Sequence, residues 1–80
     1  MKKTLKVGDK VIYRCRWGED LPKETIIENI ELCNEEGEKY GDVVNEMTED
    51  NYKRCCLDLA DKHWCYGYQI DWEDSIKLNN

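Results

Sequence analysis

Hydrophobic and polar residues alternate most regularly near the end of the chain, between His63 and Trp72. Every second position of this stretch holds a large apolar side chain, and the positions between them are smaller or polar. Because successive side chains of a β-strand point to opposite faces, the pattern predicts a half-buried strand with one aromatic face. We expect this face to lie in the core and Trp64 to be structural. Its members are Trp64, Tyr66, Tyr68, Ile70 and Trp72.

The first part of the chain has two further strand candidates. Residues 7–17 alternate, with Val11, Tyr13, Cys15 and Trp17 on one face, after a turn or bulge at Gly8-Asp9. Residues 25–32 begin with a β-branched run that favours a strand. Their apolar residues also fit helical spacing, so a helix stays open as the alternative, and we prefer the strand. Polar turns are expected at residues 34–37 and 48–51.

Residues 40–47 predict another strand, which should bury Val43, Val44 and Met47. Residues 52–60 fit a strand or a helix, and periodicity alone does not decide between them. A strand ending at Ala60, followed by Asp61-Lys62, would form a tight hairpin with the aromatic strand, and we prefer this interpretation. In that strand Cys55 and Cys56 would face opposite sides, one in the core and one exposed.

Together these segments predict a single, mostly β domain. Five short strands at roughly ten-residue spacing suggest a small barrel over residues 5–72, because barrel closure removes exposed strand edges. Residues 73–80 are expected to form a tail, from which Ile76 and Leu78 dock on the end of the barrel.

Composition and charge limit the partners of such a domain. The chain has 80 residues, of which 38% are charged, and its net charge is −6. Residues 1–17 carry six basic groups and one acidic group, whereas residues 18–50 carry two basic and twelve acidic groups. Phosphate contacts need cations, so this acidic middle argues against a nucleic-acid partner and favours a protein with a basic surface. The sequence does not indicate an oligomeric state.

Cysteine and histidine are the residue types that would carry zinc or nucleophilic chemistry. The chain has five cysteines and one histidine, but no C-x-x-C pair, and His63 with Cys65 is a weak pair on one strand face. No third group that would orient His63 is evident. We therefore predict no catalytic residue, metal or cofactor, although a small zinc- or cysteine-dependent domain remains an alternative. We predict a cytoplasmic protein, because the cysteine count is odd and no export signal is evident. We predict no membrane span, because no apolar run reaches ~20 residues.

Three segments resemble a known family. Residues 6–11 (KVGDKV) resemble the opening strand of small SH3-like barrels of the Tudor and KOW kind, and residues 40–44 (YGDVV) are similar to their G-x-V-V strand. Residues 57–70 look like their closing hairpin, although Asp61-Lys62 replaces the glycine often found there. The resemblance implies a five-stranded barrel that binds peptides, nucleic acids or proteins and is not an enzyme. Compact acidic chains of this shape are similar to short proteins of bacteriophages and mobile elements.

Aromatic rings beside carboxylates suggest where a partner binds. Trp17 precedes an acidic loop, and Tyr40 precedes Gly41-Asp42. Aromatic rings with carboxylates beside them suit a basic ligand, because a cation over an aromatic face gains ~0.5–2 kcal/mol. The same rings would otherwise serve only as core. The candidate partner-binding residues are Trp17, Glu19, Asp20, Tyr40, Asp42, Glu35, Glu36 and Glu38.

Two functions follow from these candidates. We predict a non-catalytic SH3-like binding module that acts through protein–protein interaction. The alternative uses the acidic middle, which would mimic the phosphate row of a nucleic acid, as in a phage-type inhibitor of a host nuclease or defence protein. The simplest interpretation of the same acidic residues is a solvated surface.

Overall fold

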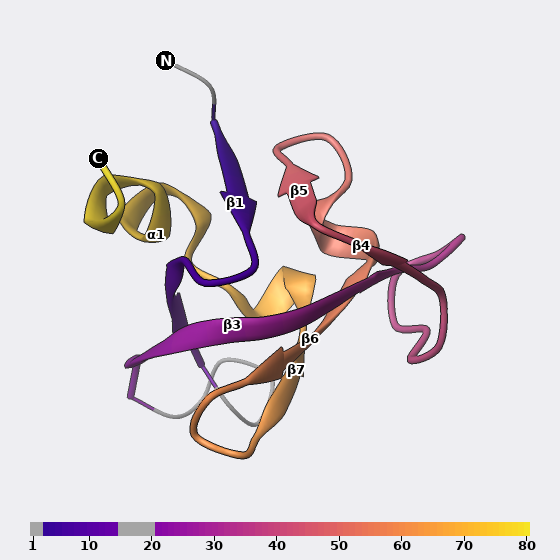
Figure 1. Cartoon of the computed structure of the whole chain (residues 1–80), viewed down its shortest axis with the longest axis horizontal. Helices are drawn as coiled ribbons and strands as arrows, with labels where there is room; N and C mark the ends of the chain where they lie inside the picture. Colours follow the sequence, from indigo (N-terminus) through magenta and orange to yellow (C-terminus); the bar gives the residue numbers. More distant parts are fainter. Residues whose placement is uncertain (1–2, 15–20) are drawn as a thin grey trace.

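The computed structural model describes residues 3–14 and 21–80 (Figure 1). Within these ranges the chain is mostly strands, arranged in two antiparallel sheets and followed by one α-helix. A two-stranded sheet pairs β1 (Thr4–Lys6) with β5 (Glu46–Thr48). The larger sheet holds β2 (Lys10–Tyr13), β3 (Lys23–Leu32), β4 (Asp42–Val44), β6 (Cys55–Leu59) and β7 (Trp64–Tyr66), and the helical elements are η2 (Tyr52–Arg54), η3 (Gly67–Gln69) and α1 (Trp72–Leu78).

The long strand β3 joins most of the structure together. In Figure 1 it runs across the molecule, with β1 and β5 on one side and β6 and β7 on the other. Its first half pairs with β2 and its second half with β4 and β6, and the register shifts between Ile27 and Asn29. This irregularity lets Ile27 and Ile30, three residues apart, both face the core. The predicted strand at residues 25–32 is confirmed, and the irregularity explains why its apolar spacing also fitted a helix.

The core lies between the two sheets and α1. Val11 and Tyr13 are fully buried on one face of β2, as their alternation predicted. The turn before β2 is also confirmed, because Gly8 has a φ of +96°, which glycine adopts without strain. Most other core side chains are aliphatic. The cluster contains Leu5, Val11, Tyr13, Ile27, Ile30, Met47, Cys55, Leu57, Leu59, Cys65, Ile70, Trp72 and Ile76.

The predicted hairpin between β6 and β7 is confirmed, but its first strand begins only at Cys55, because residues 52–54 form η2, and residues 60–63 connect the two strands. The two strands are antiparallel, with Leu57 opposite Cys65. The turn needs no glycine, because Lys62 itself takes a left-handed conformation with a φ of 69° and Asp61 accepts a 3.1 Å hydrogen bond from the His63 backbone N–H. Cys55 and Cys56 are both buried, so the expectation that one of them is exposed was wrong.

The aromatic stretch differs most from its prediction. Its strand ends at Tyr66, and over residues 64–67 the two faces are reversed, because Cys65 and Gly67 are buried whereas Trp64 is 44% exposed. Ile70 and Trp72, at the end of the stretch, are buried as predicted. The close approach of η2 accounts for this reversal. A Cβ at Gly67 would lie only 1.6 Å from the backbone oxygen of Tyr52, so only glycine fits there. The prediction that Trp64 is a core residue was therefore wrong.

The predicted tail is a helix instead. Asp71 caps α1 by accepting a 3.3 Å hydrogen bond from the Asp74 N–H, and Ile76 is buried, whereas Leu78 is 37% exposed. The helix covers the open edge of β2. There the buried Ser75 hydroxyl accepts the Ile12 N–H at 2.9 Å, and Asn79 bonds both the N–H and the carbonyl of Lys10. Side chains thus replace a neighbouring strand along this edge.

Two other predictions about the strands need correction. Residues 40–47 form β4 and β5 in different sheets, and Val43 is 70% exposed rather than buried. In the described residues the larger sheet does not close into a five-stranded barrel. Instead the chain leaves η3 and meets β2 through a single bridge between Tyr13 and Ile70.

Among the described residues, no helix has the length and apolar character needed to cross a membrane.

Candidate functional site

The larger sheet has an inner and an outer face, which its register defines. Directly opposed residues lie on the same side of a sheet, and one such row, Ile30, Leu57 and Cys65, is buried in the core. The neighbouring rows must face outward. They contain Val43, Glu31, Cys56 and Tyr66, and then Asn29, Asp58 and Trp64.

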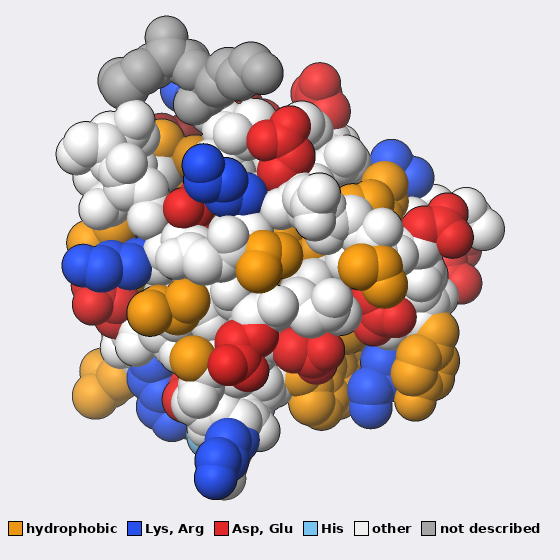
Figure 2. Space-filling model, viewed as in Figure 1, with side chains coloured by type: hydrophobic (Ala, Val, Ile, Leu, Met, Phe, Trp, Pro, Cys, Tyr) orange, Lys and Arg blue, Asp and Glu red, His pale blue; other side chains and the backbone are white. Residues whose placement is uncertain are grey.

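Three aromatic rings lie together on the outer face. Tyr66 makes an edge contact with Trp64, with ring centroids 5.2 Å apart, and stacks on Tyr68 of η3 at 5.3 Å. The ammonium of Lys39 lies 4.3 Å from the centroid of Trp64 and 5.9 Å from that of Tyr40. We call Trp64, Tyr66, Tyr68 and Tyr40 the aromatic surface. In Figure 2 a basic side chain lies between hydrophobic ones at the lower right, with acidic side chains nearby.

Carboxylates surround the aromatic surface. Burial, followed by the charges of Asp58 and Glu31, raises the pKa of Cys56 to about 11, and Lys39 opposes this shift. Burial, Tyr66 and the charge of Glu36 raise the pKa of Tyr68. Asp58 lies directly opposite Trp64, and Glu31 lies in the same outward-facing row as Tyr66, so anionic groups adjoin the rings and this surface suits a cation.

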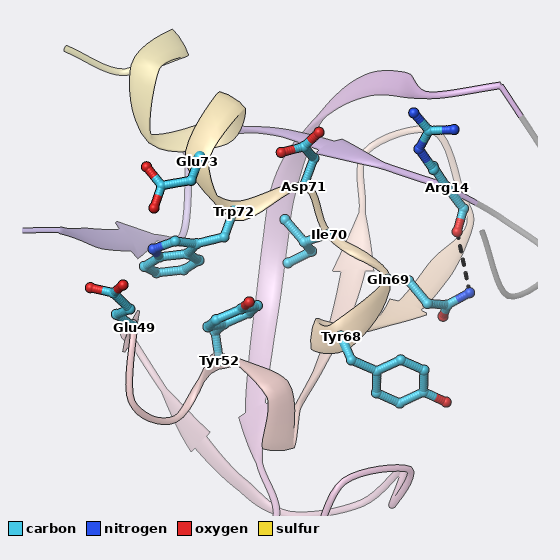
Figure 3. Close-up of a pocket in the computed structure, with 9 residues that line it drawn as sticks. All are labelled: Arg14, Glu49, Tyr52, Tyr68, Gln69, Ile70, Asp71, Trp72 and Glu73. Carbon is cyan, nitrogen blue, oxygen red and sulfur yellow. Dashed lines mark hydrogen bonds between the residues drawn. The ribbon is translucent and has the colours of Figure 1, made fainter.

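A pocket of about 710 Å³ lies between η2, η3 and the start of α1 (Figure 3). Tyr52 stacks on Trp72 in it, with centroids 4.4 Å apart and an angle of 17° between the rings. The Trp72 Nε1 is buried and has no hydrogen-bond partner in the described part of the chain. The lining residues are Arg14, Glu49, Tyr52, Tyr68, Gln69, Ile70, Asp71, Trp72 and Glu73.

A hydrogen-bonded group of Tyr13, Asp61 and His63 was not predicted from the sequence. The hydroxyl of the buried Tyr13 donates a 2.6 Å hydrogen bond to Asp61, whose other oxygen lies 3.4 Å from the His63 Nδ1. Burial acts to raise the pKa of Asp61, but hydrogen bonds from Tyr13 and His63 outweigh it, so this pKa is lowered. Cys65 is 1% exposed in the core, whereas the His63 side chain is 60% exposed. His63 and Cys65 therefore do not form a nucleophile–base pair open to a substrate.

The structure brings some of the predicted site residues together. Tyr40 is 81% exposed and shares Lys39 with Trp64, which was assigned to the core. Asp42 begins β4, and the Glu38 carboxylate accepts a 2.7 Å hydrogen bond from the backbone N–H of Glu35, next to the exposed Glu36, between β3 and β4. The predicted site residues Trp17, Glu19 and Asp20 lie outside the described residues. Within those residues, no three Cys, His, Asp or Glu side chains are grouped to hold a metal.

The pocket was missed because nothing in the sequence links Tyr52 to Trp72, which lie twenty positions apart. The fold and site define an antiparallel β-rich domain with an exposed aromatic surface and an adjoining pocket. Comparison with protein-family models, with curated proteins and with solved structures found no match.

Proposed function

We propose that this chain is a non-catalytic, SH3-like binding module that recognises a protein partner with a basic surface. The position of Lys39 over Trp64 carries this proposal, because it places a cation on an exposed ring of the aromatic surface. Cation–π attraction at such a site is worth ~0.5–1 kcal/mol and more when the pair is desolvated. A lysine or arginine of the partner would take the place of Lys39. The strand order β2-β3-β6-β7, with Ile70 bridging back to Tyr13 on the other edge of β2, supports the SH3-like relationship.

The arrangement of the aromatic surface also supports binding rather than folding. Trp64 is 44% and Tyr40 81% exposed, so neither ring is fully used in the core. Aromatic residues are enriched where protein interfaces are buried, because they supply a large contact area. Asp58, Glu31 and Glu36 would attract a basic partner and repel an acidic one.

A capture experiment tests the proposal. Intact protein is immobilised, captured partners are identified by mass spectrometry, and affinities are measured by surface plasmon resonance at two salt concentrations. Trp64→Ala should fold normally and lose the partner, while Ile26→Ala, at an exposed residue of β3 that is not part of the aromatic surface, should retain it. Lys39→Gln removes the internal cation and should strengthen binding about two- to fivefold. Unchanged binding by a Trp64→Ala/Tyr66→Ala double variant would contradict the proposal.

The same experiment examines the inhibitor alternative. Reversing Glu35, Glu36 and Glu38 to Lys changes the charge of the segment between β3 and β4. If mimicry of a nucleic acid is the function, this variant should lose its partner, and binding should weaken steeply with salt. If the aromatic surface is the site, the reversal should slow association and leave the off-rate nearly unchanged.

A further inference from the structure

The pocket of Figure 3 contains a buried donor that the described fold leaves without an acceptor. Trp72 is 5% exposed, and its Nε1 has no hydrogen-bond partner among these residues. In Figure 3 the nitrogen-bearing edge of the indole faces the side of the pocket where the carboxylates of Glu49 and Glu73 lie. A buried donor is costly to leave unpaired. Its position in an open pocket points to an acceptor that comes from a ligand.

The charges around the pocket restrict the ligand. Three acidic residues line it, Glu49, Asp71 and Glu73, against one basic residue, Arg14, at the other end. Asp71 is engaged in capping α1, and Glu73 lies 3.9 Å from Lys3 in a pair that is more than half exposed and therefore weak. An anionic acceptor would be repelled at the end where Trp72 lies. A neutral carbonyl close to a cationic group fits both the unpaired Trp72 N–H and the surrounding carboxylates.

We propose that this pocket binds an arginine-bearing segment of a partner polypeptide. A backbone carbonyl of the segment accepts the Trp72 Nε1–H, and the arginine guanidinium pairs with Glu49 and Glu73. Arginine suits this arrangement better than lysine, because its planar fork of donors can reach two carboxylates. The proposal goes beyond the aromatic surface, since different elements form the pocket. Tyr68 connects the two, because it lines the pocket and stacks on Tyr66.

Nuclear magnetic resonance of the tryptophan indole groups provides the test. The peptide acetyl-Gly-Arg-Gly-amide is titrated into ¹⁵N-labelled intact protein, and Trp72→Phe assigns the Trp72 signal. We expect a saturable shift of that signal, about tenfold weaker binding of the citrulline analogue, which has the same shape without the charge, and weaker binding by Glu49→Gln. Glu46→Gln, at an exposed residue of β5 outside the pocket, is the matched control and should bind normally.

Two results would overturn the proposal. They are an unmoved Trp72 signal at millimolar peptide and equal binding of the arginine and citrulline peptides. The signal of Trp64 reports separately on the aromatic surface. A shift of Trp64 alone would overturn the pocket and support the aromatic surface, whereas a shift of Trp72 alone would support the pocket.

Discussion

Gly67 is the position at which a single methyl group should harm the fold most clearly. An ideal Cβ there would lie 1.6 Å from the backbone oxygen of Tyr52, 2.7 Å from its carbonyl carbon and 3.3 Å from the oxygen of Cys55. Real Cβ contacts essentially never fall below 3.0 Å, so in Gly67→Ala the backbone of η2 or η3 must move by 1.4 Å or more, the difference between 3.0 and 1.6 Å. These are backbone atoms, so no side-chain rotation relieves the clash.

The expected cost of Gly67→Ala can be estimated from this displacement. Overpacking costs ~1–3 kcal/mol and occasionally more, and a rigid backbone obstacle belongs at or above the upper end. At ~0.05–0.15 kcal/mol per residue, a domain of this length has a total stability of about 4–12 kcal/mol. A loss of ~3 kcal/mol would lower Tm by roughly 12–24 °C. The shift should also disturb the stack of Tyr52 on Trp72, which depends on the position of η2.

Gly37→Ala is the matched control. Nothing lies within 4 Å of a Cβ at Gly37, but its φ of +84° makes alanine strained there, at about 1–2 kcal/mol. Thermal and urea unfolding, followed by circular dichroism and tryptophan fluorescence, would compare the two variants. Gly67→Ala should be clearly the less stable of the two. Equal stability of the two variants would refute the packing of η2 against η3 described above.

Three further predictions concern the rest of the fold. Tyr13→Phe should lower stability by about 1–2 kcal/mol at pH 7, because it removes a hydrogen bond to a charged carboxylate. Since the pKa of Asp61 is lowered in the folded state, this contribution is present above the ordinary pKa of 3.8 and is lost as pH falls through the folded pKa, so the two proteins should converge in acid unfolding curves. Ser75→Ala should lower the stability by about 1–3 kcal/mol, because it leaves the Ile12 N–H unpaired. The control Lys77→Ala, on the exposed side of α1, should change the stability by no more than about 0.5 kcal/mol. Similar urea unfolding midpoints for the two variants would contradict the docking of α1 on β2. Four thiols should react with a thiol reagent only after denaturation, because all four are buried: those of Cys33, Cys55, Cys56 and Cys65. Burial also raises the pKa of Cys55 and Cys56 to about 11, which keeps these two thiols protonated at neutral pH. Fast reaction of the four thiols in the native protein would contradict their burial.

Local patterns predicted several elements well. The β-branched residues at 25–27 indicated β3, and the alternation of Val11 and Tyr13 indicated the buried face of β2. The hairpin from β6 to β7 followed from the length of the connection. Each of these features depends on neighbours in the chain, and for that reason sequence alone was sufficient.

The elements at the end of the chain show where such patterns are insufficient. Alternation indicates that Trp64 and Cys65 lie on opposite faces, but not which face is inside. The packing of η2 against Gly67 decides that, and it is a contact between distant segments. The start of α1 did have a signal in Asp71, an acidic first turn and the spacing of Trp72 and Ile76. The period-two pattern, extended as far as Trp72, hid this signal.

The outward position of Trp64 also bears on function. Burying a large apolar side chain gains ~1.5–3 kcal/mol, so a fold that leaves Trp64 half exposed forgoes part of this stabilisation. The core is filled instead by Leu, Ile, Val and Met with one buried tyrosine, whose hydroxyl has Asp61 as its partner. Trp72 is the other large ring inside, and its nitrogen is the one buried side-chain polar atom in the described residues without a partner. Trp64 on the outer face and Trp72 Nε1 in the pocket are thus two places where a bound partner would add contacts that the fold does not supply.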